Sequence, residues 1–347
     1  MEKANKRRLP VLEMVRKLLR TKWFQLLFIS VIVVVAVYNV DHGFLSRGNV
    51  RNILRGMVVP GIMMVAVGPL LAGGGIDLAA ASQATLASVL FAKLMVYMPG
   101  MPWGVAAIIT LTAGAVFGLI NVLLINGLNF LAFIATISMS TIFQGITQMW
   151  TGMYDITVRN ESITNLGKIS IINDWVPVLF IIMLALVALY VYMMANTRFG
   201  RSIYMVGGNP TAARLAGINP KKVKAILFIN SGIMSALAGI AWSAQNKMAH
   251  PTAISTNAPN FTALTAVIIG GVSFNGGSGT LAAGFFGMVI VRLFENGLMM
   301  LGFRSYVNVA AQGLILIVAL ITDHISAVRQ RKALNATAMS TVYKKAN

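Results

Sequence analysis

Apolar segments of membrane-spanning length recur along this chain and restrict its fold more than any other feature. A helix needs about 20 apolar residues to cross the hydrocarbon core of a bilayer. Segments of this kind lie near residues 23–40, 56–72, 77–97, 103–125, 130–151, 175–195, 223–245, 262–274, 280–301 and 306–322. Only 11% of the residues are charged, whereas a soluble domain has about 25%. The sequence therefore predicts an all-α integral membrane protein, a single domain over 1–347 with about ten transmembrane helices.

The eighth segment, 262–274, is shorter than the others and runs into the sequence SFNGGSG. Non-helical backbone at membrane depth is tolerated where it is buried in protein or lines a cavity. The sequence leaves open whether this segment crosses the bilayer fully or is broken and re-entrant.

Positive charge gathers outside the apolar segments. Of 28 Lys and Arg residues, eight lie in residues 1–22, six in 196–224 and five in 323–347. Because Lys and Arg favour cytoplasmic segments, we expect the N-terminal segment 1–22, the loop 196–222 and the tail 323–347 on the cytoplasmic side. This placement accounts for the net charge of +19 without a nucleic-acid partner. Three arginines in 44–56 predict a separate amphipathic helix at the membrane surface.

Residues that carry catalytic chemistry are scarce. The chain has no cysteine, three histidines and nine acidic residues, and it lacks a G-x-x-x-x-G-K-[ST] loop. We therefore expect no enzyme activity, no catalytic residue, no metal site and no cofactor in this chain. Asp77 is expected at a helix start, and Arg292 and Glu295 are expected to pair along one helix face.

An ion-coupled carrier is the first alternative class. Such a carrier normally needs a relay of mid-membrane carboxylates or histidines, and that relay is missing from the sequence. If the chain is such a carrier, Asp77, Arg292 or Glu295 is essential. A purely structural subunit of a larger complex is the second alternative.

Uncharged polar side chains in or beside the apolar segments supply the candidates for a solute pathway. These are Gln144, Gln148, Asn121, Trp242, Gln245 and Asn296. Amides donate and accept hydrogen bonds, and aromatic faces cover the C–H surface of a sugar ring, so the set suits a neutral polyhydroxylated solute. Hydrogen bonding between packed helices is the competing interpretation. The two are balanced for Gln144 and Gln148, and helix packing is favoured for the others.

The stretch NTRFGRSIYMVGGNPTAARLAGINPKKVK at 196–224 interrupts the apolar pattern. Asn209 before Pro210 suits a helix cap and first turn, and Gly217 suits a C-terminal stop. We expect a short helix of about two turns between them. Such a helix, held against a membrane bundle, is a suitable docking element for a partner protein.

Three stretches, in order, resemble bacterial ABC-importer permeases of the ribose, xylose and galactoside type. The loop at 196–224 resembles T-x-F-G-R-x-[IV]-x-A-x-G-x-N-x-x-A-A-x-x-x-G-[IV]. GGGIDLAAAS at 73–82 resembles the family's G-G-I-D-L-S-V-G-S, and TALTAVIIGGVSFNGGSGTLAAGFFG at 262–287 resembles its A-I-A-A-V-V-L-G-G-x-S-x-x-G-G-x-G-x-x-x-G. The resemblance covers almost the whole chain. Asn260 and Phe261 stand where the family often has Glu and Leu.

The resemblance implies a ten-helix permease in the bacterial inner membrane, which imports a small neutral sugar such as a galactoside, ribose or xylose. It implies four partners of this chain: a second permease copy, a cytoplasmic ATPase that carries ATP and Mg, an extracytoplasmic sugar-binding protein and membrane lipid. Carried onto this sequence, the ATPase-docking residues are Gly207, Gly208, Asn209, Ala212, Ala213, Leu215 and Gly217. The remaining motif residues are Gly74, Asp77, Ser82, Gly270, Gly271, Gly276 and Gly277.

Overall fold

The computed structural model describes residues 22–158, 160–257 and 259–346. The predicted N-terminal segment 1–22 lies, apart from Lys22, outside these residues. The long helices are α2 (Lys22–Val40), α3 (Arg47–Ala72), α4 (Ala80–Tyr97), α5 (Trp103–Val122), α6 (Ala132–Thr151), α8 (Val178–Asn196), α11 (Pro220–Asn246), α14 (Leu281–Met300) and α15 (Ser305–Ala346). The shorter helices are η1 (His42–Leu45), η2 (Leu123–Gly127), α7 (Glu161–Lys168), α9 (Arg198–Gly208), α10 (Pro210–Leu215), α12 (Ala253–Asn257) and α13 (Pro259–Ile269).

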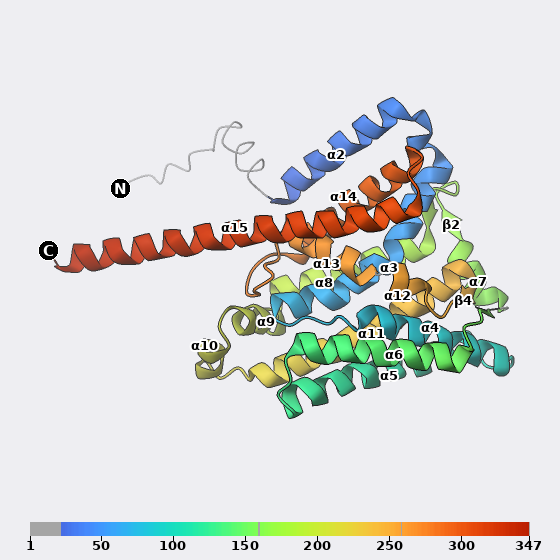
Figure 1. Ribbon diagram of the computed structural model, residues 1–347, viewed down its shortest axis with the longest axis horizontal. Coiled ribbons are helices and arrows are strands. Elements are labelled where there is room, and N and C mark those ends of the chain that lie inside the picture. Colours follow the sequence, from blue (N-terminus) through green and yellow to red (C-terminus); the bar gives the residue numbers. More distant parts are fainter. Residues whose placement is uncertain (1–21, 159, 258, 347) are drawn as a thin grey trace, which may run out of the picture.

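Two small antiparallel ribbons complete the fold. Strand β1 (Ile156–Thr157) pairs with β4 (Met248–Ala249), with Ile156 opposite Ala249. Strand β2 (Ser170–Ile171) pairs with β3 (Val176–Pro177). Both ribbons lie at the same end of the helix bundle as α7, on the right in Figure 1. We call this end of the bundle the ribbon end.

Helices occupy all ten of the predicted segments, which confirms a mainly helical membrane protein. Among the described residues, seven helices are long and apolar enough to cross a membrane. The three remaining segments hold α2, α6 and α13, so the count of ten crossings is not confirmed. Helix α13 has 11 residues and is about 16 Å long at 1.5 Å per residue. That length is about half of the hydrocarbon core, so the eighth segment does not cross as one helix.

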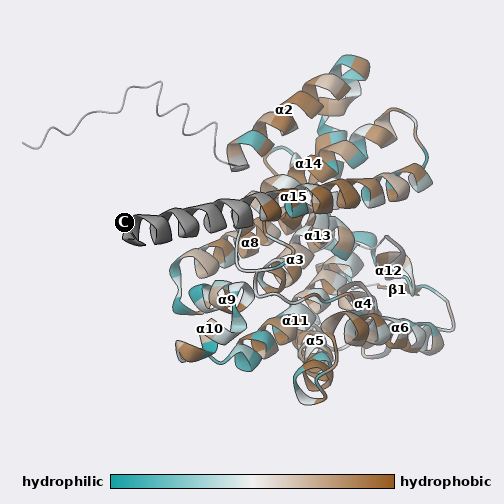
Figure 2. Cartoon of the chain, turned by 60° about the vertical axis from the view of Figure 1, so that its left-hand side comes forward, coloured by the Kyte–Doolittle hydropathy of each residue, from teal (hydrophilic) through white to brown (hydrophobic). Residues whose placement is uncertain are grey.

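Helix α3 forms the centre of the bundle, and α11 packs on α3, α4 and α5. In the most apolar 18-residue window of α3, 83% of the window is buried, whereas the corresponding share is 22% in the helices α5 and α8. The helices α5 and α11 approach closely because glycines face each other. A Cβ atom on Gly118 would lie 2.4 Å from the Phe228 carbonyl oxygen, and one on Gly232 would lie 2.0 Å from the Gly114 carbonyl oxygen. Hydrophobic residues run along the outer helices in Figure 2.

The start of α2, helices α9 and α10, and the end of α15 lie at the end of the bundle opposite the ribbons, on the left in Figure 1. We call it the loop end. Helix α15 continues without a break through the predicted tail 323–347 as far as Ala346. Lys22, the loop 196–222 and residues 323–346 of the tail, which the charge pattern assigned to one side of the membrane, therefore share one end of the structure.

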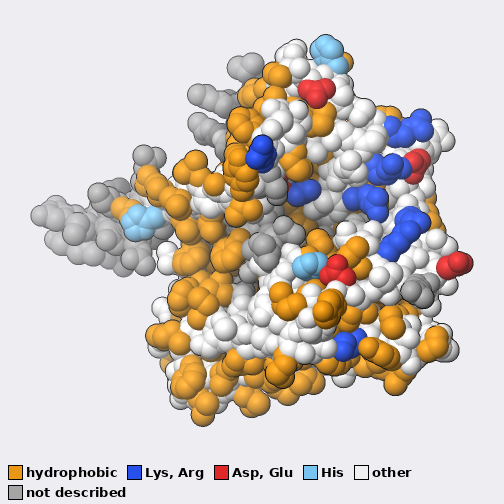
Figure 3. Space-filling view, turned by 45° about the vertical axis from the view of Figure 1, so that its right-hand side comes forward, with side chains coloured by type: hydrophobic (Ala, Val, Ile, Leu, Met, Phe, Trp, Pro, Cys, Tyr) orange, Lys and Arg blue, Asp and Glu red, His pale blue; other side chains and the backbone are white. Residues whose placement is uncertain are grey.

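The separate surface helix predicted for 44–56 is wrong. Helix α3 starts at Arg47 and runs unbroken to Ala72. Two of its arginines contact residues of the ribbon end, since Arg51 pairs with Asp174. The Arg55 guanidinium donates to the Gly167 and Gln245 carbonyl oxygens, at 3.3 and 3.4 Å. Figure 3 shows several Lys and Arg side chains on this side, with Asp and Glu side chains among them.

Candidate functional site

Helix α10 forms as the sequence predicts. The Asn209 Oδ1 atom accepts from the backbone N–H groups of Thr211 and Ala212, both at 3.0 Å. Pro210 occupies the first helical position, where its missing N–H costs nothing. Gly217 follows the helix end with φ of +81°, a backbone conformation that favours glycine.

Helix α10 presents a small apolar and basic surface. Ala213 is 1% exposed and anchors the helix on the bundle. On the other face Leu215 is 87% exposed, beside the exposed side chains of Ala212 and Arg214. A large apolar side chain held out on a capped helix has the form of a knob that fits a partner's pocket.

Helix α9 is a feature that the sequence analysis missed. The polar stretch before Asn209 forms this helix of 11 residues, with Thr197 as its cap. It buries Gly200, Ile203 and Val206 against the bundle. Their i, i+3, i+6 spacing is the signal that identifies the helix.

Glycines from all three motif stretches meet beneath α9. The Gly277 N–H donates to the Ala72 carbonyl oxygen at 2.8 Å. A Cβ atom on Gly207 would lie 1.9 Å from that same oxygen, and one on Gly276 would lie 2.9 Å from the Gly74 Cα atom. We call Gly74, Gly207, Gly208, Gly276 and Gly277 the glycine junction. It brings α9, the end of α3 and the turn between α13 and α14 into backbone contact.

Neighbouring polar groups hold the glycine junction in place. The Tyr204 hydroxyl, on α9, donates to the Gly279 carbonyl oxygen at 2.9 Å. Partial burial raises the pKa of Tyr204, which further favours the protonated hydroxyl that donates this bond. Asp323, on α15, accepts from the Phe274 N–H at 3.1 Å. The motif glycines Gly270 and Gly271 lie outside the junction, in the turn that ends α13.

Asp77 lies in the non-helical stretch between α3 and α4. Its carboxylate accepts from the Ala79 N–H at 2.9 Å and from the Ser231 hydroxyl of α11 at 2.7 Å. The position near the start of α4 agrees with the expected one. The hydrogen bond from Ser231 also joins this stretch to α11, a contact that the sequence did not indicate.

A polar hollow of about 250 Å³ lies between α4, α6, α12 and α13. It is lined by Leu78, Ala81, Ser82, Ser140, Thr141, Gln144, Ser255, Asn260 and Phe261. The Ser82 and Ser140 hydroxyls lie 2.8 Å apart. We call it the serine hollow. None of the side chains that line it is charged, so it offers hydrogen bonds without a net charge.

The structure separates the predicted pathway residues. Gln144 lines the serine hollow, whereas Gln148, one turn further along α6, does not. Asn121 is fully buried, and its amide has no partner among the described residues. Trp242 and Gln245 line a second hollow together with Arg292 and Glu295. Ser82 was named as a motif residue, but the other hydroxyl residues of the serine hollow, Ser140, Thr141 and Ser255, were missed because no spacing signal links α6 and α12 to α4.

Asn296 joins two packed helices, which is the role that the sequence favoured for it over a place in the solute pathway. Its side-chain amide exchanges two hydrogen bonds with the Asn49 amide, at 2.8 and 2.9 Å. The pair joins α3 to α14 in the interior of the bundle. It lines neither hollow.

Replacing Asn296 with leucine is expected to lower stability and to leave solute specificity unchanged. Losing such an interhelical bond costs about 0.6–1.7 kcal/mol in a membrane protein. Thermal unfolding of the purified protein in detergent measures the loss. A protein of native thermal stability that has lost transport would instead place Asn296 in the pathway.

The comparisons with known proteins define the class of this chain. The family described as "Branched-chain amino acid transport system / permease component" matches residues 49–320. The chain belongs to this family and is a multi-pass permease of the bacterial inner membrane, not a catalytic enzyme. No solved structure gives a significant match.

Individual relatives match over most of the chain. The ribose import permease protein of Bacillus subtilis is 33% identical over 294 residues, which are 84% of this chain and 89% of the relative. The galactose/methyl galactoside import permease protein of Escherichia coli is 31% identical over 310 residues, or 84% and 90%. A probable ABC transporter permease protein of Escherichia coli is 32% identical over 292 residues, or 84% and 86%.

Proposed function

We propose that this chain is the membrane-spanning subunit of an ATP-driven importer for a small neutral sugar. The serine hollow carries the proposal, because hydroxyl and amide groups without a charged side chain line it. Sugars offer many hydroxyl groups and no charge, so they match this lining. The names of the relatives, a ribose import permease and a galactose/methyl galactoside import permease, support the same solute class.

The loop end faces the cytoplasm in this proposal. Basic segments favour the cytoplasmic side, and the loop 196–224 carries six Lys and Arg residues without an acidic one. The start of α2 and the end of α15 lie at the same end as this loop. The ribbon end then faces outward and receives the sugar-binding protein.

The ATPase docks on α10, and ATP and Mg bind to the ATPase. A capped helix with one exposed leucine fits a recessed surface on a soluble partner. A second permease copy completes the pathway, and the uncovered apolar surfaces of the outer helices leave room for it and for lipid.

The glycine junction transmits the movement of the docked helices. Backbone contacts between α9, the end of α3 and the α13–α14 turn have no flexible side chain that could absorb a displacement. A shift of α9 is therefore passed to the stretch that holds Asp77 and to α13. Both elements border the serine hollow, through Leu78 and Asn260. ATP-driven movement at the loop end thus alters the hollow without any charged relay in the membrane.

Asn260 is the residue of the serine hollow that most favours a neutral solute. Asn260 lines the serine hollow at the place where the family often has glutamate. Its Oδ1 atom is buried and has no partner among the described residues. An amide accepts and donates without charge, so we propose that this atom bonds a sugar hydroxyl.

Replacing Gln144 with leucine tests the hollow, and Gln148 on the same helix gives the matched control. Loss of one neutral hydrogen bond costs about 0.5–1.5 kcal/mol. We expect the sugar concentration for half-maximal uptake to rise about two- to tenfold for Gln144→Leu. Gln148→Leu should leave it unchanged. Equal effects of both substitutions, or none, would contradict the assignment of the pathway to the serine hollow.

A further inference from the structure

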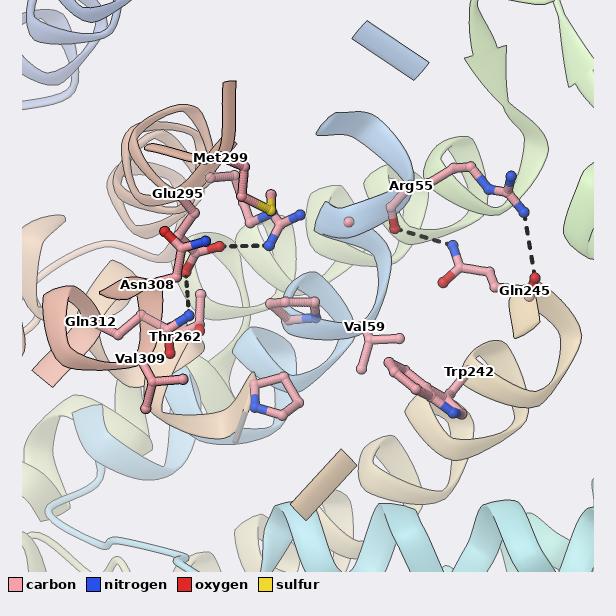
Figure 4. A pocket seen from close by; sticks show the side chains of 14 residues that line it. Arg55, Val59, Trp242, Gln245, Thr262, Glu295, Met299, Asn308, Val309 and Gln312 are labelled. Atoms are coloured by element: carbon pink, nitrogen blue, oxygen red, sulfur yellow. Dashed lines mark hydrogen bonds and ion pairs between the residues drawn. The ribbon is translucent and has the colours of Figure 1, made fainter. Parts of the chain in front are cut away.

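A second hollow, also of about 250 Å³, lies near the ribbon end between α3, α11, α13, α14 and α15. Figure 4 shows its side chains converging from these helices. We call it the tryptophan hollow, after Trp242 in its wall. At about 30 Å³ for each water, it has room for about eight waters.

A compensated ion pair is built into one wall. The Arg292 Nη1 atom lies 2.5 Å from Glu295 Oε2, and Gln312 Nε2 donates to Glu295 Oε1 at 2.8 Å. Glu295 is 3% exposed. Gly56 makes room for the guanidinium, since a Cβ atom there would lie 1.7 Å from Arg292 Nη2. The wall therefore presents donors and acceptors together without net charge.

The remaining charge near the hollow is directed away from it. The Arg55 guanidinium donates to the Gly167 and Gln245 carbonyl oxygens, and Gln245 Nε2 donates to the Arg55 carbonyl oxygen at 3.1 Å. Figure 4 shows this group beyond the Gln245 side chain. A cation finds no unpaired carboxylate among the lining residues, because Glu295 is paired with Arg292, and the Arg55 guanidinium bonds two backbone carbonyl oxygens.

Three polar atoms in the wall have no hydrogen-bond partner among the described residues. They are Trp242 Nε1, Arg292 Nε and Asn308 Oδ1, and all three are buried. Buried polar groups in native proteins are almost always paired with protein, water or ligand. These two donors and one acceptor belong to residues that line one hollow, and a molecule that both accepts and donates would supply the missing partners.

We propose that the tryptophan hollow binds one neutral polyhydroxylated solute of monosaccharide size, and this rests on the proposed function. The indole of Trp242 covers the C–H face of the ring, with Val59 and Pro259 completing the apolar wall. The Arg292–Glu295 pair and Asn308 bond its hydroxyl groups. The site is distinct from the serine hollow.

The two hollows lie on either side of the first turn of α13. Pro259 and Thr262 line the tryptophan hollow, whereas Asn260 and Phe261 line the serine hollow. A short movement of α13, whose other end leads to the glycine junction, exposes one hollow to the other. The tryptophan hollow is then the first site that the solute occupies after the binding protein releases it at the ribbon end.

Equilibrium binding of radiolabelled ribose, xylose and galactose tests the proposal. The permease–ATPase complex is reconstituted in lipid nanodiscs without the binding protein, and uptake is measured in parallel in proteoliposomes that contain it. Met299→Trp fills the hollow at its rim, and Trp242→Phe removes the indole N–H. Met98→Trp, at an exposed methionine that lines neither hollow, is the matched control.

We expect saturable binding of one sugar that weakens about tenfold or more in Met299→Trp and less in Trp242→Phe. Met98→Trp should retain it. Native-strength binding in both hollow variants would overturn the site. Absence of saturable binding in a complex that takes up sugar overturns the site and leaves the proposed function intact. A complex that takes up none of the three sugars contradicts the proposed solute class, and the site with it.

Discussion

Alanine at position 207 is expected to lower transport by about tenfold or more, whereas alanine at position 208 is expected to be tolerated. A Cβ atom on Gly207 would lie 1.9 Å from the Ala72 carbonyl oxygen and 2.7 Å from the Gly277 nitrogen. Both are backbone atoms, so α9 must move away from the glycine junction. On Gly208 the added Cβ atom meets only the Gly277 Cα atom, at an ordinary contact of 3.8 Å.

Overpacking of this kind costs about 1–3 kcal/mol, and here the displaced element is the one that carries α10. We expect ATP-dependent uptake to fall by about tenfold or more in Gly207→Ala, with ATPase binding retained. Gly208→Ala should keep uptake near the native rate. Uptake in proteoliposomes and thermal unfolding check both variants. A fully active Gly207→Ala protein would show that contacts at the glycine junction are not needed for coupling.

Aspartate in place of Leu215 is expected to release the ATPase from the permease. The Leu215 side chain is 87% exposed, and exposed substitutions usually change stability by less than about 0.5 kcal/mol. Central apolar anchors at interfaces often contribute about 2 kcal/mol or more. The variant therefore loses its partner while it keeps its own fold.

Co-purification of the ATPase from native membranes measures this effect, with thermal unfolding of the permease as the second reading. Ala213→Asp is the informative contrast, because Ala213 is buried and a charge there destabilises the permease itself. Lys222→Asp, on the exposed first turn of α11, controls for added negative charge. An ATPase that stays bound to Leu215→Asp would remove α10 as the docking site.

The sequence was most informative where a local rule applies. The apolar segments predicted the helices because every backbone polar group in a bilayer must be satisfied within the segment. Asn209, Pro210 and Gly217 predicted α10 because cap and stop residues act on adjacent peptide groups. The spacing of the arginines in 44–56 predicted a surface helix, and this prediction was wrong. The partners of Arg51 and Arg55 come from segments that are distant in the sequence, so a local pattern does not reveal them.

The candidate site was only partly predictable. The motif glycines were recognised one stretch at a time, but no local rule shows that Gly74, Gly207 and Gly277 touch. Gln144 and Gln148 look equivalent in sequence, and only the packing of α12 and α13 distinguishes them. Trp242 and Glu295 were assigned separate roles because their shared hollow depends on the crossing of five helices.

Uptake by the reconstituted importer, with permease, ATPase and binding protein in sealed liposomes, tests the account most directly. Sugar uptake is measured with ATP supplied on the side of the ATPase, in the presence and absence of ionophores that collapse proton and sodium gradients. The account predicts uptake that requires ATP and persists when both gradients are gone. Uptake that needs a proton or sodium gradient and proceeds without ATP would contradict it and identify an ion-coupled carrier.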